Sequence, residues 1–253
     1  MQFFKTFILL AFISIFTYCD VEPVDTVLSN EITNPNNPNN PNNPNNPNNP
    51  NNPNNPNNPS AADYFPRAIN NTWNFKYNTT ENVQIKLLST ETINGISFYK
   101  FNRFFSDDLF DFGDTSSYVA RVGDSYIYRS VSQSNQPGLP PTTVAMQYSL
   151  LKSNLNIGQT WNDNQNITVN VMGLTVTYQI QIQGKILEKG TSVTIGNTTY
   201  NDVIKTEIKM YMQGVEIISN YWFAKNVGII KAVEAEDLQT QVDSFELTSF
   251  QLN

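Results

Sequence analysis

The residues of this chain that could do chemistry are carboxylates and aromatic rings, because the sequence has no histidine and one cysteine. Without histidine there is no Ser–His–Asp triad, no Cys–His pair and no imidazole metal ligand. Two carboxylates facing each other across a cleft could hydrolyse a glycosidic bond, but spacing in a strand-rich sequence does not reveal that separation. No catalytic residue is predicted, and a hydrolase of envelope or extracellular glycans stays the alternative hypothesis.

Carboxylates are densest in the stretch 106–116 around Gly113, which contains Asp107, Asp108, Asp111 and Asp114. Carboxylate oxygens are ligands of hard cations such as Ca²⁺. The order of the residues does not follow the calcium loop D-x-[DN]-x-[DN]-G, and Phe110 and Phe112 interrupt the polar run. A solvated acidic loop is therefore favoured over a metal site, and no cofactor is predicted.

The tryptophans are the candidates for contact with a ligand, namely Trp73, Trp161 and Trp222. Their rings could stack on sugars or line an apolar cavity. Each lies in an aromatic or β-branched stretch, so packing in a core is the favoured alternative. The run Tyr221-Trp222-Phe223 places aromatic rings on both faces of a strand, because consecutive side chains point in opposite directions. Trp222 is thus the first ring to test for ligand binding.

The elements that must position these residues are predicted to be strands. Thr72–Tyr77 places Trp73, Phe75 and Tyr77 on one face, and 175–183 alternates apolar with Thr and Gln side chains. The weak helical pattern of Met146–Leu155 lacks clear caps, and we interpret it as strand and turn.

Turn signals recur at Asn94-Gly95, Gly123-Asp124, Gly184-Lys185, Gly196-Asn197 and Gln213-Gly214. The predicted fold class is all-β: a single antiparallel, open or partly closed barrel or sandwich over 61–253. A sheet of this length that curls without a helix inside it would leave an apolar concavity where a ligand could bind.

Two segments resemble each other. Asn71-Thr72-Trp73-Asn74 is echoed by Gln159-Thr160-Trp161-Asn162, and each is followed by a predicted hairpin with an Asn/Gly turn. The spacings within the two copies differ, so this is a hint of duplication only.

A spacer precedes the domain. In Asn34–Pro59, proline recurs at every third position and asparagine fills the others. Proline interrupts helices and removes donors from strands, and nothing apolar is available to offset conformational entropy. The segment is predicted to be a disordered, semi-stiff tether that reaches on the order of 80 Å where polyproline II persists.

The N-terminus predicts export and attachment to a membrane. Residues 1–18 combine one early cation with an apolar run typical of a signal peptide, and Cys19 follows that run. Cys19 resembles the lipidated cysteine of bacterial lipoproteins, although Tyr18 before it is unusual; ordinary signal cleavage is the alternative. The acidic linker 19–33 resembles the surface-export signal of Bacteroidetes lipoproteins, with a plain solvated linker as the other interpretation.

Charge limits the partners. The formal net charge is −7, and no basic stripe or cluster is visible. This argues against nucleic acid and against binding anionic headgroups through charge. The predicted contact with a membrane is the N-terminal lipid alone.

The domain as a whole resembles a family of uncharacterised Bacteroidetes cell-envelope lipoproteins. The resemblance rests on Tyr64-Phe65-Pro66 with Asn71-Thr72-Trp73, on Ile157–Trp161, on Thr199–Lys205 and on Tyr221–Lys231. It implies a lipid-anchored domain in the cell envelope, at the outer membrane or the cell surface, and no established activity. The predicted function is a binding or scaffold module for an apolar or a glycan ligand.

Overall fold

The structure is a computed structural model that describes residues 62–105, 114–134, 142–171, 174–236 and 242–253. These residues form strands and no helix, so the all-β prediction is confirmed; none of them lies in a helix able to cross a membrane. The strands are β1 (Thr72–Tyr77), β2 (Glu81–Ile93), β3 (Ile96–Phe101), β4 (Asp114–Val122), β5 (Ser125–Ser134), β6 (Thr142–Lys152), β7 (Thr160–Asn162), β8 (Gln165–Val171), β9 (Leu174–Ile195), β10 (Thr198–Met212), β11 (Val215–Ala224), β12 (Gly228–Glu236) and β13 (Val242–Gln251).

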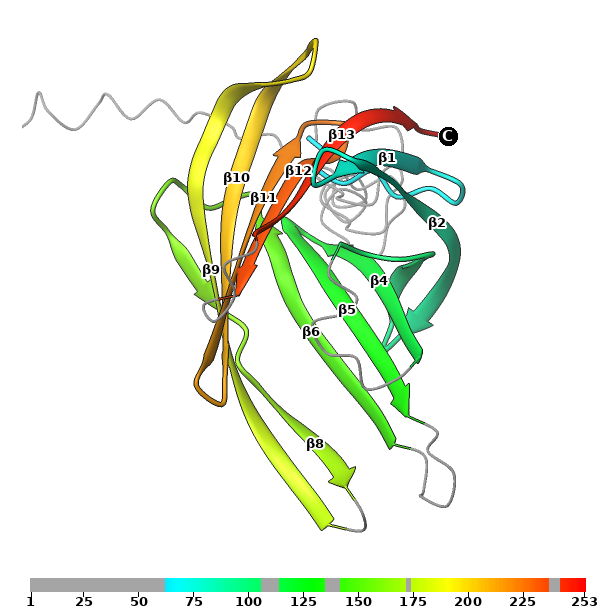
Figure 1. The fold of residues 1–253 in the computed structure, drawn as a ribbon, viewed down its shortest axis with the longest axis vertical. Coiled ribbons are helices and arrows are strands. Elements are labelled where there is room, and N and C mark those ends of the chain that lie inside the picture. The colour runs from blue at the N-terminus through cyan, green and yellow to red at the C-terminus, as the bar shows by residue number, and fades with distance from the viewer. Residues whose placement is uncertain (1–61, 106–113, 135–141, 172–173, 237–241) are drawn as a thin grey trace, which may run out of the picture. The chain divides into compact units, whose positions relative to one another are not determined.

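All strands belong to one antiparallel sheet in the order β6-β5-β4-β3-β2-β1-β13-β12-β11-β10-β9-β7, with β8 paired to β9 (Figure 1). The predicted alternation is confirmed in both test segments. Trp73 and Phe75 of β1 are buried, and 175–183 of β9 alternates exposed polar with covered apolar side chains. Met146–Leu155 is the end of β6 and a turn, as interpreted.

Two-residue turns join consecutive strands where Asn/Gly signals predicted them. Asn94 and Gly95 have φ of 51° and 78°, and Gln213 and Gly214 have φ of 52° and 87°. Positive φ at both positions is what a type I′ hairpin requires. The turn predicted at Gly184-Lys185 is wrong, because both residues lie inside β9, paired with β10 on one side and β7 on the other. Gly184 lets the ring of Trp161 approach the backbone of β9 closely, as described below.

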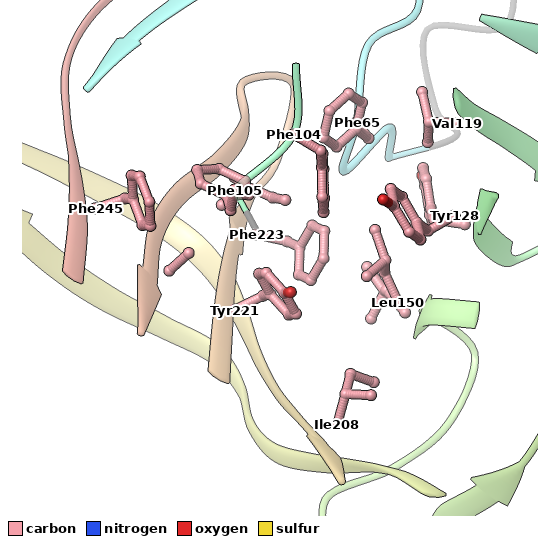
Figure 2. Packing of buried hydrophobic residues seen from close by; sticks show 14 of the residues in the cluster. Phe65, Phe104, Phe105, Val119, Tyr128, Leu150, Ile208, Tyr221, Phe223 and Phe245 are labelled. Atoms are coloured by element: carbon pink, nitrogen blue, oxygen red, sulfur yellow. The ribbon is translucent and has the colours of Figure 1, made fainter. Parts of the chain in front are cut away.

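The interior of the sheet is filled by rings that follow β3. Phe104 stacks on Tyr128 with ring centroids 4.6 Å apart, and Phe105 lies 5.1 Å from Phe245. Figure 2 shows both phenylalanines among side chains from the surrounding strands. A cavity of about 10 Å³ beside them, roughly the space of one water molecule, is lined by Phe65, Trp73, Phe75, Ile85, Phe104, Phe105 and Ile229. This part of the interior is packed by the chain itself.

The two ends of the sheet meet at a seam that is closed by side chains. Gln165 accepts the N–H of Gln147 and donates to its carbonyl, both at 3.2 Å. Asp163 Oδ2 accepts the N–H of Ser149 at 2.6 Å, and Trp161 Nε1 donates to the Ser149 carbonyl at 3.1 Å. No backbone ladder joins β6 to β7 or β8 in the described ranges. The backbone of the sheet is therefore not closed, which agrees with the predicted open or partly closed architecture.

The first described residues are fastened to the sheet by what we term the N-terminal clamp: Asp63, Arg67, Arg121, Tyr126 and Asn226. The Asp63 carboxylate lies 3.3 Å from Arg67 Nη2 and 3.8 Å from Arg121 Nη1, and it accepts the Tyr126 hydroxyl at 3.1 Å. The Asp63 carbonyl accepts the Asn226 N–H at 2.6 Å. Both guanidinium groups lie over the Tyr126 ring, at 5.7 and 5.2 Å from its centroid.

Candidate functional site on the outer face

Trp73 and Trp161 are both placed inside the domain. Trp73 is 2 % exposed and donates from Nε1 to the Val227 carbonyl at 2.6 Å. Trp161 is 6 % exposed and lies against Gly184, where an added Cβ would be 2.0 Å from its ring. An added Cβ at Gly228 would similarly lie 3.0 Å from Trp73 Nε1. The two resembling segments thus share one arrangement, an indole packed on glycine and bonded to a backbone carbonyl.

Trp222 lies on the opposite side of the sheet. Its neighbours in β11, Tyr221 and Phe223, are 1 % and 0 % exposed and belong to the interior cluster. Because side chains alternate along a strand, Trp222 lies on the other face of β11; it is half-buried and still packs in part against the interior cluster. The predicted arrangement of aromatics on both faces is confirmed, and it is Trp222 that faces outward.

Two lysines flank the Trp222 ring from the neighbouring strands. The register pairs Trp222 with Lys205 of β10 and with Lys231 of β12. Lys205 Nζ is 4.6 Å and Lys231 Nζ is 5.7 Å from the ring centroid, within the range of a cation–π interaction. The half-buried indole is therefore held between two ammonium groups.

Each lysine is in turn paired with a glutamate one strand further out. Lys205 Nζ lies 3.7 Å from Glu188 of β9, and Lys231 Nζ lies 2.6 Å from Glu246 of β13. We call the five side chains Glu188, Lys205, Trp222, Lys231 and Glu246 the outer row. The outer row crosses five adjacent strands and carries no net charge. It offers N–H donors, carboxylate acceptors and one aromatic surface in a line.

A second constellation links a buried and a partly exposed carboxylate. Glu234 of β12 is 7 % exposed and accepts the Tyr221 hydroxyl at 2.7 Å. Its cross-strand partner is Asp243 of β13, which accepts the Tyr77 hydroxyl at 2.7 Å. Burial, and then the charge of Glu234, raises the pKa of Tyr221 well above its usual value. The hydrogen bond to Asp243 is the main cause that raises the pKa of Tyr77.

The predicted metal site falls mostly outside the described residues. Asp107, Asp108 and Asp111 are in 106–113, and Asp114 is an exposed residue at the start of β4. In the ranges that the structure describes, no group of three or more His, Cys, Asp or Glu side chains could hold a metal ion. Cys19, the linker and the spacer also lie outside the described residues.

Sequence reasoning missed Glu234 and the four charged members of the outer row. Glu234 carries a local signal: it continues the buried face of β12 after Ile230 and Ala232, where a carboxylate is unexpected. Lys205 and Lys231 carry no such signal, because their meeting over Trp222 depends on the register of three strands.

The comparisons with known proteins yield distant structural neighbours. No family model matches the sequence, and no curated protein is similar to it. A lipoprotein candidate from Parabacteroides distasonis has 11 % identity and a TM-score of 0.39, over 76 % of this chain and 100 % of that chain. A candidate exported protein with a YmcC-like fold from Bacteroides fragilis has 8 % identity and a TM-score of 0.39, over the same shares.

A third neighbour is the hypothetical lipoprotein YmcC from Escherichia coli, with 11 % identity and a TM-score of 0.33, over 72 % of this chain and 83 % of that chain. The three are proteins of the kind that the sequence resembled, lipoproteins or exported proteins without a stated activity. No residue's role follows from resemblances this distant.

Proposed function

We propose that the protein is an envelope lipoprotein, held to a membrane through Cys19, whose β domain binds its ligand or partner through the outer row. The placement of Trp222 carries the proposal. It is a large aromatic side chain held half-buried on the outer face, between donors and acceptors that a ligand can reach. Aromatic residues are enriched in recognition surfaces, and tryptophan often carries a large share of the binding energy there.

The inner face is a weaker candidate. Phe104 and Phe105 occupy the space that an apolar ligand would need, and the cavity beside them has room for about one water molecule. Trp73 and Trp161 are committed to packing and to backbone hydrogen bonds. Recognition at the outer face requires no rearrangement of these contacts.

Cosedimentation with cell envelopes tests the outer face. The domain 61–253, prepared without the N-terminal segment, is mixed with envelopes isolated from the source organism, and the bound fraction is measured for wild type, Trp222→Ala and Tyr211→Ala. Tyr211 of β10 is a matched control, because it is an aromatic residue that is 46 % exposed and lies on the same face of the sheet as Trp222. We expect Trp222→Ala alone to lower the bound fraction. Equal binding by all three proteins would contradict the proposal.

The lipid anchor is tested separately in the full chain. Cys19→Ser should move the protein from the membrane fraction to the soluble fraction, and wild type should incorporate labelled fatty acid. Unchanged fractionation of Cys19→Ser without incorporation of label would exclude the anchor.

Deleting Asn34–Pro59 should leave fractionation and the melting temperature of the domain unchanged, because the segment has nothing apolar to bury.

Glu234 and Asp243 support the second candidate, a carboxylate-based hydrolase. Side chains of cross-strand partners lie on the same face with Cβ atoms about 4.5–5.5 Å apart, and each of these carboxylates is oriented by a tyrosine hydroxyl. Glycoside hydrolysis uses two carboxylates. Release of reducing sugars from envelope polysaccharide by wild type and not by Glu234→Gln would establish this activity; no release by wild type would exclude it for that substrate.

A further inference from the structure

We infer that the outer row binds a neutral, hydroxyl-rich glycan chain that lies across the strands. The inference rests on the proposed function, since it names the ligand class of the same site. It is carried by the order of the five side chains, acidic, basic, aromatic, basic and acidic, on five adjacent strands.

The row has the length and form of a site for a linear chain. Neighbouring strands are about 4.8 Å apart, so the row extends on the order of 19 Å from Glu188 to Glu246. The five positions are consecutive cross-strand partners on the outer face, so they form a line across the sheet. A line of contacts on a sheet surface suits an extended polymer better than a compact small molecule.

The charge pattern favours a neutral ligand. A sugar hydroxyl both donates and accepts, so it can bridge an ammonium and its paired carboxylate without separating them. An anionic chain would have to displace Glu188 and Glu246 from their lysines or lie beside them, and a cationic chain would meet Lys205 and Lys231 in the same way. Like charges placed together oppose binding, so the row discriminates against both kinds of polyion.

Trp222 supplies the apolar contact at the middle of the row. An aromatic ring offers a large apolar surface against which the C–H face of a sugar ring can pack. Lys205, whose ammonium lies 4.6 Å from the ring centroid, has a flexible side chain that can turn aside and donate to a hydroxyl. Glycan binding would thus exchange a cation–π contact for a stacked ring and a hydrogen bond.

The test uses polysaccharide from the same envelopes, separated by anion exchange into neutral and acidic fractions. Each fraction is titrated against the domain by calorimetry and by tryptophan fluorescence at two salt concentrations. Trp73 and Trp161 are buried, so we expect a fluorescence change to report Trp222. We expect the neutral fraction to bind with little dependence on salt, Trp222→Ala to weaken binding at least about tenfold, and Trp222→Tyr to restore part of it.

Two results would overturn the inference. In the first, only the acidic fraction binds, and added salt abolishes that binding. In the second, neither fraction binds, while cosedimentation with envelopes still requires Trp222; the proposed outer-face function would then stand and its ligand would not be a glycan. If Trp222→Ala instead cosedimented with envelopes as well as wild type does, the proposed function itself would be wrong. Circular dichroism of each variant confirms that the fold is retained.

Discussion

Trp161 and Trp222 are the same residue type on opposite faces of one sheet, and their surroundings differ in kind. Trp161 packs on the backbone of Gly184, and its Nε1 donates to the Ser149 carbonyl of β6. The indole thus bridges the seam, where no backbone ladder joins the described residues of β6 and β7. Trp222 lies between Lys205 and Lys231, whose flexible side chains can move. The difference indicates that the inner tryptophan serves stability, and it underlies the proposal that the outer one serves recognition.

Removing either inner indole should have the largest effect. Trp161→Ala and Trp73→Ala should each lower the free energy of unfolding by about 3–5 kcal/mol, because a buried ring and its hydrogen bond are lost. Denaturant titration of the domain measures both. A loss near zero for either would place that ring among the ligand candidates and end the contrast with Trp222.

Gly184→Ala should cost about 1–3 kcal/mol, because its Cβ would be built 2.0 Å from the Trp161 ring. In a Trp161→Ala background the same substitution should cost much less, since the clashing ring is gone. A double-mutant cycle measured by denaturant titration gives the coupling energy. Additive effects would show that Gly184 is needed for a reason other than the ring.

Asp163→Ala removes an acceptor at the seam and should cost about 1–3 kcal/mol, because it leaves the Ser149 N–H without its partner. Hydrogen exchange should accelerate at Ser149 more than at the ladder amides of β10. Asp163→Asn is the matched control, since its amide oxygen can still accept. Equal exchange in both variants would mean that the carboxylate does not hold the seam.

Tyr64→Phe should cost about 0.5–1.5 kcal/mol at neutral pH, because the hydroxyl donates to Asp202 Oδ1 at 3.0 Å. Burial, and then the hydrogen bond to Asp202, raises the pKa of Tyr64 from 10.0 to about 12. A folded-state pKa above the unfolded one gives stability that is full below pH 10 and is lost as pH rises toward 12. In melting curves, Tyr64→Phe should lose less stability than wild type as the pH rises from 10 toward 12.

Trp222→Ala should cost less stability than removal of either inner indole, because its ring is only partly buried and its other contacts are the two cation–π interactions. The measurement is again denaturant titration, with Tyr211→Ala beside it. A cost comparable to that of Trp161→Ala would assign Trp222 to the packing of the sheet and remove the distinction between the two faces.

Local patterns predicted the parts of this fold that local geometry determines. Alternation identified the buried face of β1, and Asn94-Gly95 identified a hairpin, because strand period and positive φ are properties of a few consecutive residues. The turn prediction at Gly184 was wrong for the same reason. A glycine indicates a turn locally, whereas its partner Trp161 is 23 positions away and is identified only by the β7–β9 register.

The outer row and the Glu234–Asp243 pair depend on register between strands, and some of these ladders contain bulges. The β10–β9 and β11–β12 pairings both shift register, so no count along the chain places Lys205 and Lys231 beside Trp222. Likewise, nothing in Phe104-Phe105 distinguishes rings that fill an interior from rings on a strand. Those features were beyond prediction from one sequence.

The N-terminal clamp also determines how the domain responds to force. A pull along the chain from the N-terminus reaches the domain at Asp63, whose bonds connect it to Arg121 and Tyr126 near the β4–β5 turn and to Asn226 between β11 and β12. The load at Asp63 is thus shared between two separate hairpins, β4–β5 and β11–β12, before it reaches β1, which is paired on both sides.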